Sequence, residues 1–511
     1  MLSKGYGAAV HGVDARIITI EVNIVQGTKF WLSGLPDSAV KESEHRIESA
    51  LKHFDYRMPR QKVVVNMAPA DIKKEGSAYD LPIALGVLNA SNQINAPELE
   101  KYLIMGEMAL DGNLRPIKGV LPIAIEARNN CFKGFILPSE NANEAAIVND
   151  LDVIGVGNLI EAIEFLEGKR HIEPLEYDTR DKFFTHLNDY EADFSNVQGQ
   201  ENIKRALEIA AAGGHNVIMI GPPGAGKTML AKRLPSILPP LSLYEALETT
   251  KIHSVAGKLT ANGDLVTKRP FRSPHHTVSD VALVGGGGNP QPGEISLAHN
   301  GVLFLDELPE FKRTVLEVMR QPLEERKVTI SRAKVSVDFP SNFMLIASMN
   351  PCPCGYYNHP EKDCVCGSGQ VQRYLNKISG PLLDRIDLHV EVTPVSFDQM
   401  TENRKAEDSA AIRERVIKAR AIQTARLKDH GLHSNAMMPS QMVKDICQIN
   451  EPGRVLLKTA MERLGLSARA YDRILKVSRT IADLASSEDI KIEHLAEAIQ
   501  YRSLDRDGWA G

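Results

Sequence analysis

The spacing of apolar and polar residues divides the chain into three blocks. Residues 1–172 mix strand-like apolar runs with helix-like runs. Residues 193–395 alternate short apolar strands with helices, which is typical of a parallel α/β sheet. Residues 396–511 have helical spacing and little strand signal, so we predict an all-α bundle there. Residues 173–192 are polar and weakly patterned, and we predict a linker. The pattern therefore predicts a multi-domain α/β protein.

A glycine-rich loop follows the first apolar strand of the middle block. Residues 215–220 have the pattern of a buried strand, and residues 228–234 have that of a helix. The segment between them matches the phosphate-binding pattern G-x-x-x-x-G-K-[ST]. Glycines let backbone N–H groups turn inward around phosphate oxygens, and a helix N-terminus adds the positive end of its dipole. We predict that this loop binds ATP through Gly221, Pro222, Pro223, Gly224, Ala225, Gly226, Lys227 and Thr228.

Two acidic residues, Asp306 and Glu307, follow a second apolar strand at residues 302–305. The carboxyl ends of parallel strands form the ligand-binding edge of an open α/β sheet, so both acids are expected beside the phosphate loop. Lys227 would reach the β- and γ-phosphates, while Thr228 and Asp306 would hold Mg²⁺. Glu307 would act as the general base that polarises the attacking water.

Two further residues are candidates for the same site. Asn350 follows the apolar strand 343–349, where its amide either orients the attacking water or caps a turn before Pro351. Arg385 is flanked by aspartates, so it is either ion-paired at the surface or an arginine finger that reaches the nucleotide of a neighbouring subunit.

Composition and charge limit the classes of partner. Hydrophobic residues make up 43% of the 511 residues and charged residues 24%, as in globular proteins. The net charge is −5, so any nucleic-acid site must be a local positive patch. We find no apolar stretch that could span a membrane and no signal-like N-terminus, so we predict a cytoplasmic protein without a membrane partner.

Four of the six cysteines cluster in residues 352–366. They are Cys352, Cys354, Cys364 and Cys366. Four thiols this close in a cytoplasmic protein predict a structural Zn²⁺ site, with His359 as an alternative ligand. The other interpretation is a loop with four free thiols, which would be prone to oxidation.

The order of phosphate loop, acidic strand, Asn350, Arg385 and helical block resembles that of the AAA+ ATPases. Four segments narrow the resemblance to the magnesium-chelatase-like branch and, within it, to the ComM/YifB family. They are F-R-S-P-H-H-T at 271–277, A-L-V-G-G-G at 282–287, P-G-E-I-S-L-A-H-N-G at 292–301 and L-D-R-I-D at 383–387. The resemblance covers nearly the whole chain and implies an AAA+ phosphate-loop core with an all-α lid.

The resemblance also implies roles that the residue pattern leaves open. Asn350 becomes the sensor 1 residue and Arg385 the finger that acts in trans. Arg469 becomes the sensor 2 arginine of the lid, with Arg473 one helical turn later as its rival. A finger that acts in trans implies a homo-oligomeric ring, which we expect to be a hexamer.

The N-terminal block is similar to the ChlI-type domain, which implies a Lon-protease-like α+β fold. Lon proteases use a Ser–Lys dyad, but the matching positions here carry Ala78 and Leu121. Ser77 and Lys118 are shifted alternatives. A dyad needs two groups within hydrogen-bond distance, and we expect the domain to be non-proteolytic.

Two basic segments are candidates for DNA binding. Residues 325–337 have the alternation of a β-hairpin with Lys327, Arg332 and Lys334 around its tip. In rings of this branch, the resemblance implies, this hairpin lines the channel, where basic residues follow a phosphate backbone. Arg272 belongs to a second basic and aromatic segment beside a glycine-rich run. Taken alone, either patch is better explained as a solvated surface.

The resemblance favours an ATP-dependent DNA motor, a hexameric branch-migration helicase that acts on single-stranded or branched DNA in recombination or natural transformation. The alternative is a chelatase-like or chaperone-like motor subunit that acts on a protein partner. A third hypothesis, an ATP-dependent protease, is disfavoured by Ala78 and Leu121.

Overall fold

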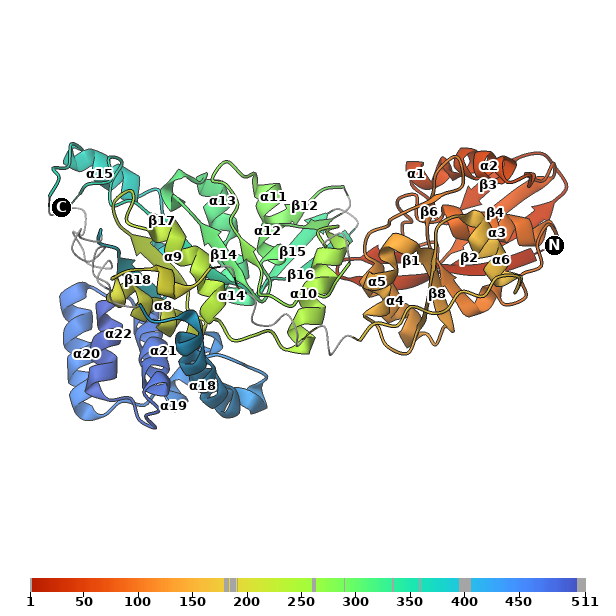
Figure 1. Cartoon of the computed structure of the whole chain (residues 1–511). Helices are drawn as coiled ribbons and strands as arrows, with labels where there is room; N and C mark the ends of the chain where they lie inside the picture. The colour runs from red at the N-terminus through yellow and green to blue at the C-terminus, as the bar shows by residue number, and fades with distance from the viewer. Residues whose placement is uncertain are drawn as a thin grey trace.

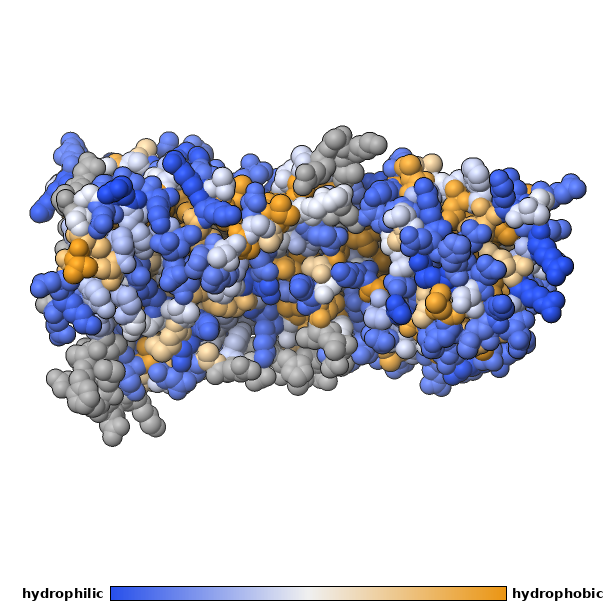
Figure 2. Space-filling view, turned by 90° about the horizontal axis from the view of Figure 1, so that it is seen from above, coloured by the Kyte–Doolittle hydropathy of each residue, from blue (hydrophilic) through white to orange (hydrophobic). Residues whose placement is uncertain are grey.

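A computed structural model of the chain describes residues 2–178, 183, 190, 192–259, 263–288, 290–332, 335–357, 359, 361–394 and 406–502. Figure 1 shows an elongated molecule with the N-terminal sheet at one end, a second sheet in the middle, and a group of helices, α18 to α22, packed on the far side of that second sheet. Hydrophilic residues cover most of the face seen in Figure 2, and hydrophobic residues form small separate patches on it.

The N-terminal block is a seven-stranded mixed sheet in the order β3-β4-β2-β1-β5-β8-β9. Its central strands alternate buried and less buried residues, as a sheet with one packed face requires. The strands are β1 (Leu2–His11), β2 (Asp14–Val25), β3 (Phe30–Ser33), β4 (Lys62–Ala68), β5 (Tyr102–Ile104), β8 (Gly134–Pro138) and β9 (Asp152–Val156), with a separate pair of β6 (Glu107–Met108) and β7 (Leu114–Arg115). The helices are α1 (Ser38–Lys41), α2 (Ser43–His53), α3 (Asp80–Ala90), α4 (Val120–Asn129), α5 (Ala142–Ala146) and α6 (Leu159–Leu166).

The middle block is a five-stranded parallel sheet in the order β11-β14-β17-β10-β18. Its three central strands are buried at every position, which explains their continuous apolar sequence. The strands are β10 (Val217–Ile220), β11 (Phe271–Arg272), β14 (Val302–Leu305), β17 (Met344–Met349) and β18 (Leu388–Glu391). Two hairpins stand apart from the sheet: β12 (Gly285–Gly286) with β13 (Gln291–Pro292), and β15 (Lys327–Arg332) with β16 (Val335–Pro340). The helices are α8 (Glu201–Gly213), α9 (Lys227–Arg233), α10 (Leu243–Val255), α11 (Asp280–Val284), α12 (Glu294–Leu297), α13 (Arg313–Val318), α14 (Arg320–Glu325), α15 (Ser368–Leu375) and α16 (Gly380–Leu383).

The C-terminal block, in its described residues 406–502, consists of helices joined by short loops. It consists of α18 (Ser409–Leu427), α19 (Ser440–Ile446), α20 (Glu451–Leu464), α21 (Ala468–Leu484) and α22 (Ile492–Gln500). Side-chain caps fix the starts of the longer helices, as where Asp408 accepts a hydrogen bond from the backbone N–H of Ala411 at 2.8 Å. These helices share one core with α8 and β10, so the block is docked on the middle sheet.

The middle block also packs against the N-terminal block through α10. Leu241, Ala246 and Leu265 belong to the N-terminal hydrophobic core. The buried carboxylate of Glu144 accepts hydrogen bonds from the backbone N–H of Leu121 at 2.9 Å and from the hydroxyl of Ser254. The two blocks therefore meet through both apolar and polar contacts. Among the described residues, no helix is long and apolar enough to cross a membrane.

Candidate nucleotide site and thiol cluster

The glycine-rich loop joins β10 to α9, as the sequence predicts. Gly224 and Gly226 have φ angles of 77° and 85°, in the left-handed region that favours glycine. Gly221 is required for a different reason, because a methyl group added there would lie 2.2 Å from the carbonyl oxygen of Val392. The loop geometry therefore depends on all three of its glycines.

Lys227 is buried at the start of α9, with its ammonium group folded back on the loop. Its Nζ donates to the carbonyl oxygens of Gly221 at 2.6 Å and Pro222 at 2.9 Å, and to Oδ1 of Asn350 at 3.1 Å. Burial lowers the pKa of Lys227, and the charges of Asp306 and Glu307 oppose that shift. The strand that ends before Asn350 thus brings the predicted sensor to the predicted phosphate-binding lysine.

Asp306 lies at the carboxyl end of β14, next to the loop. Its Oδ2 accepts a hydrogen bond from the Thr228 hydroxyl at 2.7 Å, and its Oδ1 accepts one from the Ser348 hydroxyl. A hydroxyl and a carboxylate side by side are the oxygen donors that Mg²⁺ prefers. These residues fit a Mg²⁺ site, and Ser348 is a member that the sequence analysis did not identify.

Glu307 adopts a left-handed backbone conformation with a φ of 54°, and its side chain is 54% exposed. Non-glycine residues in this region are strained and concentrate at functional sites. Nδ1 of His276 lies 3.3 Å from Oε2 of Glu307, and the His275 ring lies against the His276 ring with centroids 4.1 Å apart. His276 therefore contacts the predicted general base, a contact that nothing in the spacing of the sequence predicted.

Arg385 is buried within its own chain. Its Nη2 lies 2.5 Å from Oε1 of Glu324, its Nη1 donates to the carbonyl oxygen of Pro381, and only 6% of its side chain is exposed. The structure of one chain thus pairs the predicted finger with a carboxylate of that chain. Its role in trans stays a prediction.

The two lid arginines occupy different environments. Nη1 of Arg473 lies 2.9 Å from Oδ1 of the buried Asp387, whereas Nη1 of Arg469 lies 3.9 Å from Oδ2 of Asp384 and its side chain is 59% exposed. Arg473 therefore forms an ion pair within its own chain. Arg469 has the greater freedom to meet a ligand.

The four clustered cysteines converge in the segment between β17 and α15. The Sγ atom of Cys352 lies 3.3 Å from that of Cys354 and 3.7 Å from that of Cys364, and all four Sγ atoms lie within 4.8 Å of one another. Tetrahedral Zn²⁺ with Zn–S bonds of about 2.3 Å requires sulfur atoms about 3.8 Å apart, so the cluster fits that ion. Nδ1 of His359 instead accepts backbone hydrogen bonds from Glu361 and Lys362.

The predicted DNA-binding residues include two that are ion-paired. Lys327 Nζ lies 2.9 Å from Oδ2 of Asp338 on the neighbouring strand of the β15–β16 hairpin. Arg272 makes two hydrogen bonds, of 2.6 and 2.7 Å, to Glu294. Arg332 ends β15, and Lys334 lies outside the described residues. The predicted hairpin is present, and its DNA contacts stay a prediction.

In the N-terminal block, the shifted dyad candidates have separate partners. The Ser77 hydroxyl donates to Glu107. Lys118 lies against Gly257, where an added methyl group would come within 2.8 Å of Lys118 Cε. Leu121 is fully buried. Among the described residues no hydrogen bond joins Ser77 to Lys118, so the structure does not assemble a Ser–Lys pair there.

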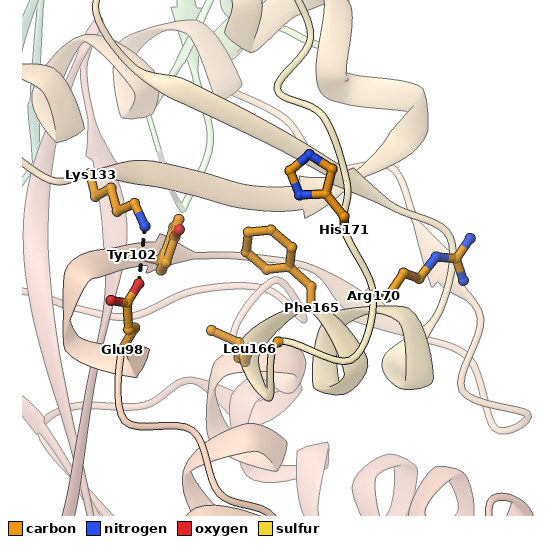
Figure 3. A pocket seen from close by; sticks show the side chains of 8 residues that line it. Glu98, Tyr102, Lys133, Phe165, Leu166, Arg170 and His171 are labelled. Atoms are coloured by element: carbon orange, nitrogen blue, oxygen red, sulfur yellow. Dashed lines mark hydrogen bonds and ion pairs between the residues drawn. The ribbon is translucent and has the colours of Figure 1, made fainter.

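A cavity of about 200 Å³ lies elsewhere on the N-terminal block (Figure 3), bordered by Tyr102 and Phe165, whose rings meet edge to face at 5.5 Å. Its two basic side chains that contact carboxylates are Lys133, 3.0 Å from Glu98, and Arg170, 3.3 Å from Glu161. Because these charges are balanced internally, the cavity offers little unpaired charge for a ligand.

Comparison with known proteins agrees with this architecture. Family models match three parts of the chain: subunit ChlI of Mg-chelatase at residues 20–141, magnesium chelatase subunit ChlI at 193–400, and the ChlI C-terminal region at 406–502. The fold and the loop constellation thus define a magnesium-chelatase-like AAA+ protein, a class that implies ATP and Mg²⁺.

Full-length relatives narrow the class. The chain is 44% identical to competence protein ComM of Haemophilus influenzae over 504 residues, which cover 98% of this chain and 97% of that protein. It is 43% identical to the protein YifB of Escherichia coli over 513 residues, 99% and 98% of the two chains. Lon protease 2 of Bacillus subtilis is 34% identical over 157 residues, 28% of this chain and 27% of that protein. The chain belongs to the ComM/YifB family.

Proposed function

We propose that the protein is an ATP-dependent DNA motor, a hexameric branch-migration helicase that acts in recombination or natural transformation. The proposal rests on the convergence of Lys227 with Asn350, and of Thr228 with Asp306, at one sheet edge in a chain related along its length to a competence protein. That edge is where nucleotides bind in parallel α/β sheets. We place the activity in the cytoplasm, as the sequence predicts.

The residues of the nucleotide site have separable tasks in this proposal. Lys227 exchanges its carbonyl acceptors for β- and γ-phosphate oxygens, and Thr228 and Asp306 hold Mg²⁺. Glu307 accepts a proton from the attacking water, which Asn350 orients. ATP supplies the free energy when its terminal phosphoanhydride bond is cleaved.

The proposed ring follows from the arginines. Arg385 stabilises the charge on the γ-phosphate of the neighbouring subunit's ATP, and Arg469 approaches the nucleotide from the lid. Hydrolysis then requires a neighbour, which couples the chemistry to rotation of subunits against one another.

We propose that DNA occupies the channel of this ring. The β15–β16 hairpin supports the proposal because it stands outside the main sheet, and because Arg332 ends its first strand. Lys334 belongs to the proposal through the sequence alone. Lys327 and Arg272 would have to exchange their carboxylate partners for phosphate oxygens. A ring repeats each hairpin, so it concentrates positive charge that a single acidic chain lacks. Branch migration suits such a motor because base pairs broken on one side are formed on the other.

We also propose that the four clustered cysteines hold one structural Zn²⁺. The distances between their sulfur atoms suit a closed tetrahedral site, in which protein ligands fill every position. The N-terminal block, by contrast, is proposed to be a Lon-protease-like module without protease activity. Its support is the match of residues 20–141 to the ChlI family model, together with Ala78 and Leu121 at the expected dyad positions.

The second candidate function is a motor subunit that acts on a protein partner, because every matching family model is named for a magnesium chelatase subunit. Purified protein should separate the two when its ATPase rate is measured with forked DNA, with linear duplex and without DNA, using Lys227→Ala as the inactive control. We expect forked DNA to stimulate hydrolysis several-fold. An unchanged rate with every DNA would favour the protein-directed motor, and an active Lys227→Ala variant would refute the ATP site itself.

A further inference from the structure

The thiol cluster lies directly against the phosphate loop. Asn350 accepts a hydrogen bond from Lys227 Nζ at 3.1 Å. Five positions later, Gly355 packs on Pro223, since a methyl group added at Gly355 would lie 2.5 Å from Pro223 Cδ. Cys352 and Cys354 lie between these two contacts in the sequence. One short segment therefore touches the loop at two points and carries two of the four thiols.

Internal contacts make this segment a turn whose shape depends on its sulfur atoms. The backbone N–H of Gly355 donates to the carbonyl oxygen of Cys352 at 3.0 Å, and the N–H of Tyr357 donates to Cys352 Sγ at 3.3 Å. Gly355 has a φ of 86°, in the left-handed region. Cys364 reaches the turn from the far side of the insert, with its Sγ 3.5 Å from that of Cys354. An ion that joins the four thiols would cross-link the turn to the segment beyond it.

We propose that this metal centre is a clamp on the phosphate loop, so that occupancy by Zn²⁺, or by another soft divalent cation, sets the affinity of the protein for ATP. The bound ion holds Gly355 against Pro223 and Asn350 beside Lys227. Without the ion, the turn is held by single hydrogen bonds such as those from Gly355 and Tyr357 to Cys352, and segments held so weakly open locally at little cost. The inference rests on the proposed ATP and zinc sites and adds an energetic connection between them.

The first test measures binding and not hydrolysis, so it needs neither a ring nor DNA. Full-length protein is purified with a reductant and zinc, its metal content is determined by elemental analysis, and its affinity for a fluorescent ATP analogue is titrated in Mg²⁺. We then remove zinc with a chelator selective for it over Mg²⁺, restore it, and titrate again. We expect about one zinc per chain, and affinity that falls about tenfold or more on removal and returns on restoration.

Glycine variants test the contact itself. Gly355→Ala should bind the analogue about tenfold more weakly while it retains zinc, because its methyl group meets the Pro223 ring. Gly369→Ala is the matched control, because a methyl group there meets nothing within 4 Å and the residue is exposed on helix α15. Pro223→Ala removes the ring atoms involved, so adding Gly355→Ala to that background should cost less affinity than in the wild-type protein. If Gly355→Ala acted only through backbone strain, it would lower the ATP affinity equally in the wild-type protein and in Pro223→Ala.

The outcomes separate the inference from the proposals beneath it. A wild-type chain that never retains metal would refute the zinc site and the clamp together. Zinc that can be removed with less than a twofold change in ATP affinity would refute the clamp while both sites stand. Equal binding of the analogue by wild-type and Lys227→Ala protein would refute the ATP site, whatever the metal content. Circular dichroism of each variant identifies any that has failed to fold, and the removal of zinc from wild-type protein depends on no variant.

Discussion

The guanidinium of Arg385 is bound by the carboxylate of Glu324, at 2.5 Å between Nη2 and Oε1. Glu324 lies in α14, which ends just before hairpin β15 begins. The Nε atom of Arg385 has no hydrogen-bond partner among the described residues. A single guanidinium cannot hold both this carboxylate and a neighbour's phosphate, so an Arg385 that acts in trans must first leave Glu324. The proposed finger is thereby linked to the base of the proposed DNA hairpin.

Arg385→Ala should leave ATP affinity unchanged and reduce hydrolysis by about a thousandfold, the lower end of what arginine fingers contribute. Its partner in the test is Glu307→Gln, which should bind ATP without hydrolysing it. In mixtures of the two variants, some interfaces combine an intact finger with an intact general base, so ATPase activity should reappear. If no mixing ratio restores turnover, the shared site between subunits is wrong.

Glu324→Gln should increase the ATPase rate, because a neutral amide holds Arg385 less tightly than a carboxylate does. Glu324 is 49% exposed, so solvent screens the pair and its contribution is about 1 kcal/mol or less. That corresponds to a gain of up to about fivefold in turnover. Glu325→Gln is the matched control, since Glu325 accepts a hydrogen bond from Gln321 at 2.9 Å and not from Arg385. A slower Glu324→Gln enzyme would show that the pair supports the active state.

Apolar pattern and local chemistry predicted the parts of this molecule that depend on short stretches of chain. The strands β10, β14 and β17 are buried on both faces, so their sequences are continuously apolar and lie within one residue or two of the predicted bounds. The position of Asn350 beside Lys227 followed from the rule that parallel strands end at one edge.

The contacts that the sequence did not reveal join segments whose relative placement is set by tertiary packing. Arg272 counts as a free cation in the sequence, yet Glu294 binds it through two hydrogen bonds. The contact of His276 with Glu307 likewise depends on how the segment after β11 folds over the sheet edge. A count of basic residues along the sequence overestimates the number of free cations, because the carboxylates that pair with them can lie far away in the sequence.

His276→Ala should lower the ATPase rate several-fold with little change in ATP affinity. His276 contacts Glu307, and among the described residues no hydrogen bond or ion pair joins it to the phosphate loop, so its loss should disturb the general base alone. His275→Ala serves as the comparison, because Nδ1 of His275 is hydrogen-bonded to Thr277 at 2.9 Å and its ring contacts His276 rather than Glu307, so its loss should lower the rate less. Hydrolysis and binding are measured separately, by phosphate release and by titration with the ATP analogue. Equal ATPase rates for the two variants would show that the contact of His276 with Glu307 does not support hydrolysis.

The two lid arginines should differ in what their loss changes. Arg473→Ala leaves the buried carboxylate of Asp387 without its nearest cation and should lower the free energy of unfolding by about 3–5 kcal/mol. Arg469→Ala removes an exposed side chain and should change stability by no more than about 0.5 kcal/mol. If Arg469 contacts the nucleotide, its variant should nevertheless hydrolyse ATP more slowly. An Arg473→Ala protein that is fully stable but hydrolyses ATP slowly would instead make Arg473 the sensor 2 arginine.

The stability difference between wild-type and Arg473→Ala protein should also depend on pH. Burial alone would raise the pKa of Asp387, but Arg473 and the nearby His215 hold it well below its usual range. A depressed carboxyl pKa contributes stability above the unfolded value of about 4, and this contribution is lost as the pH falls below it. Burial lowers the pKa of His215, so both proteins lose stability as the pH falls below about 6.5. Protonated His215, 3.7 Å from Asp387, would then partly replace the missing arginine in the variant. Urea unfolding at neutral and acid pH should therefore show a difference that shrinks with acidification, and a constant difference would mean that Arg473 acts through packing and not through its charge.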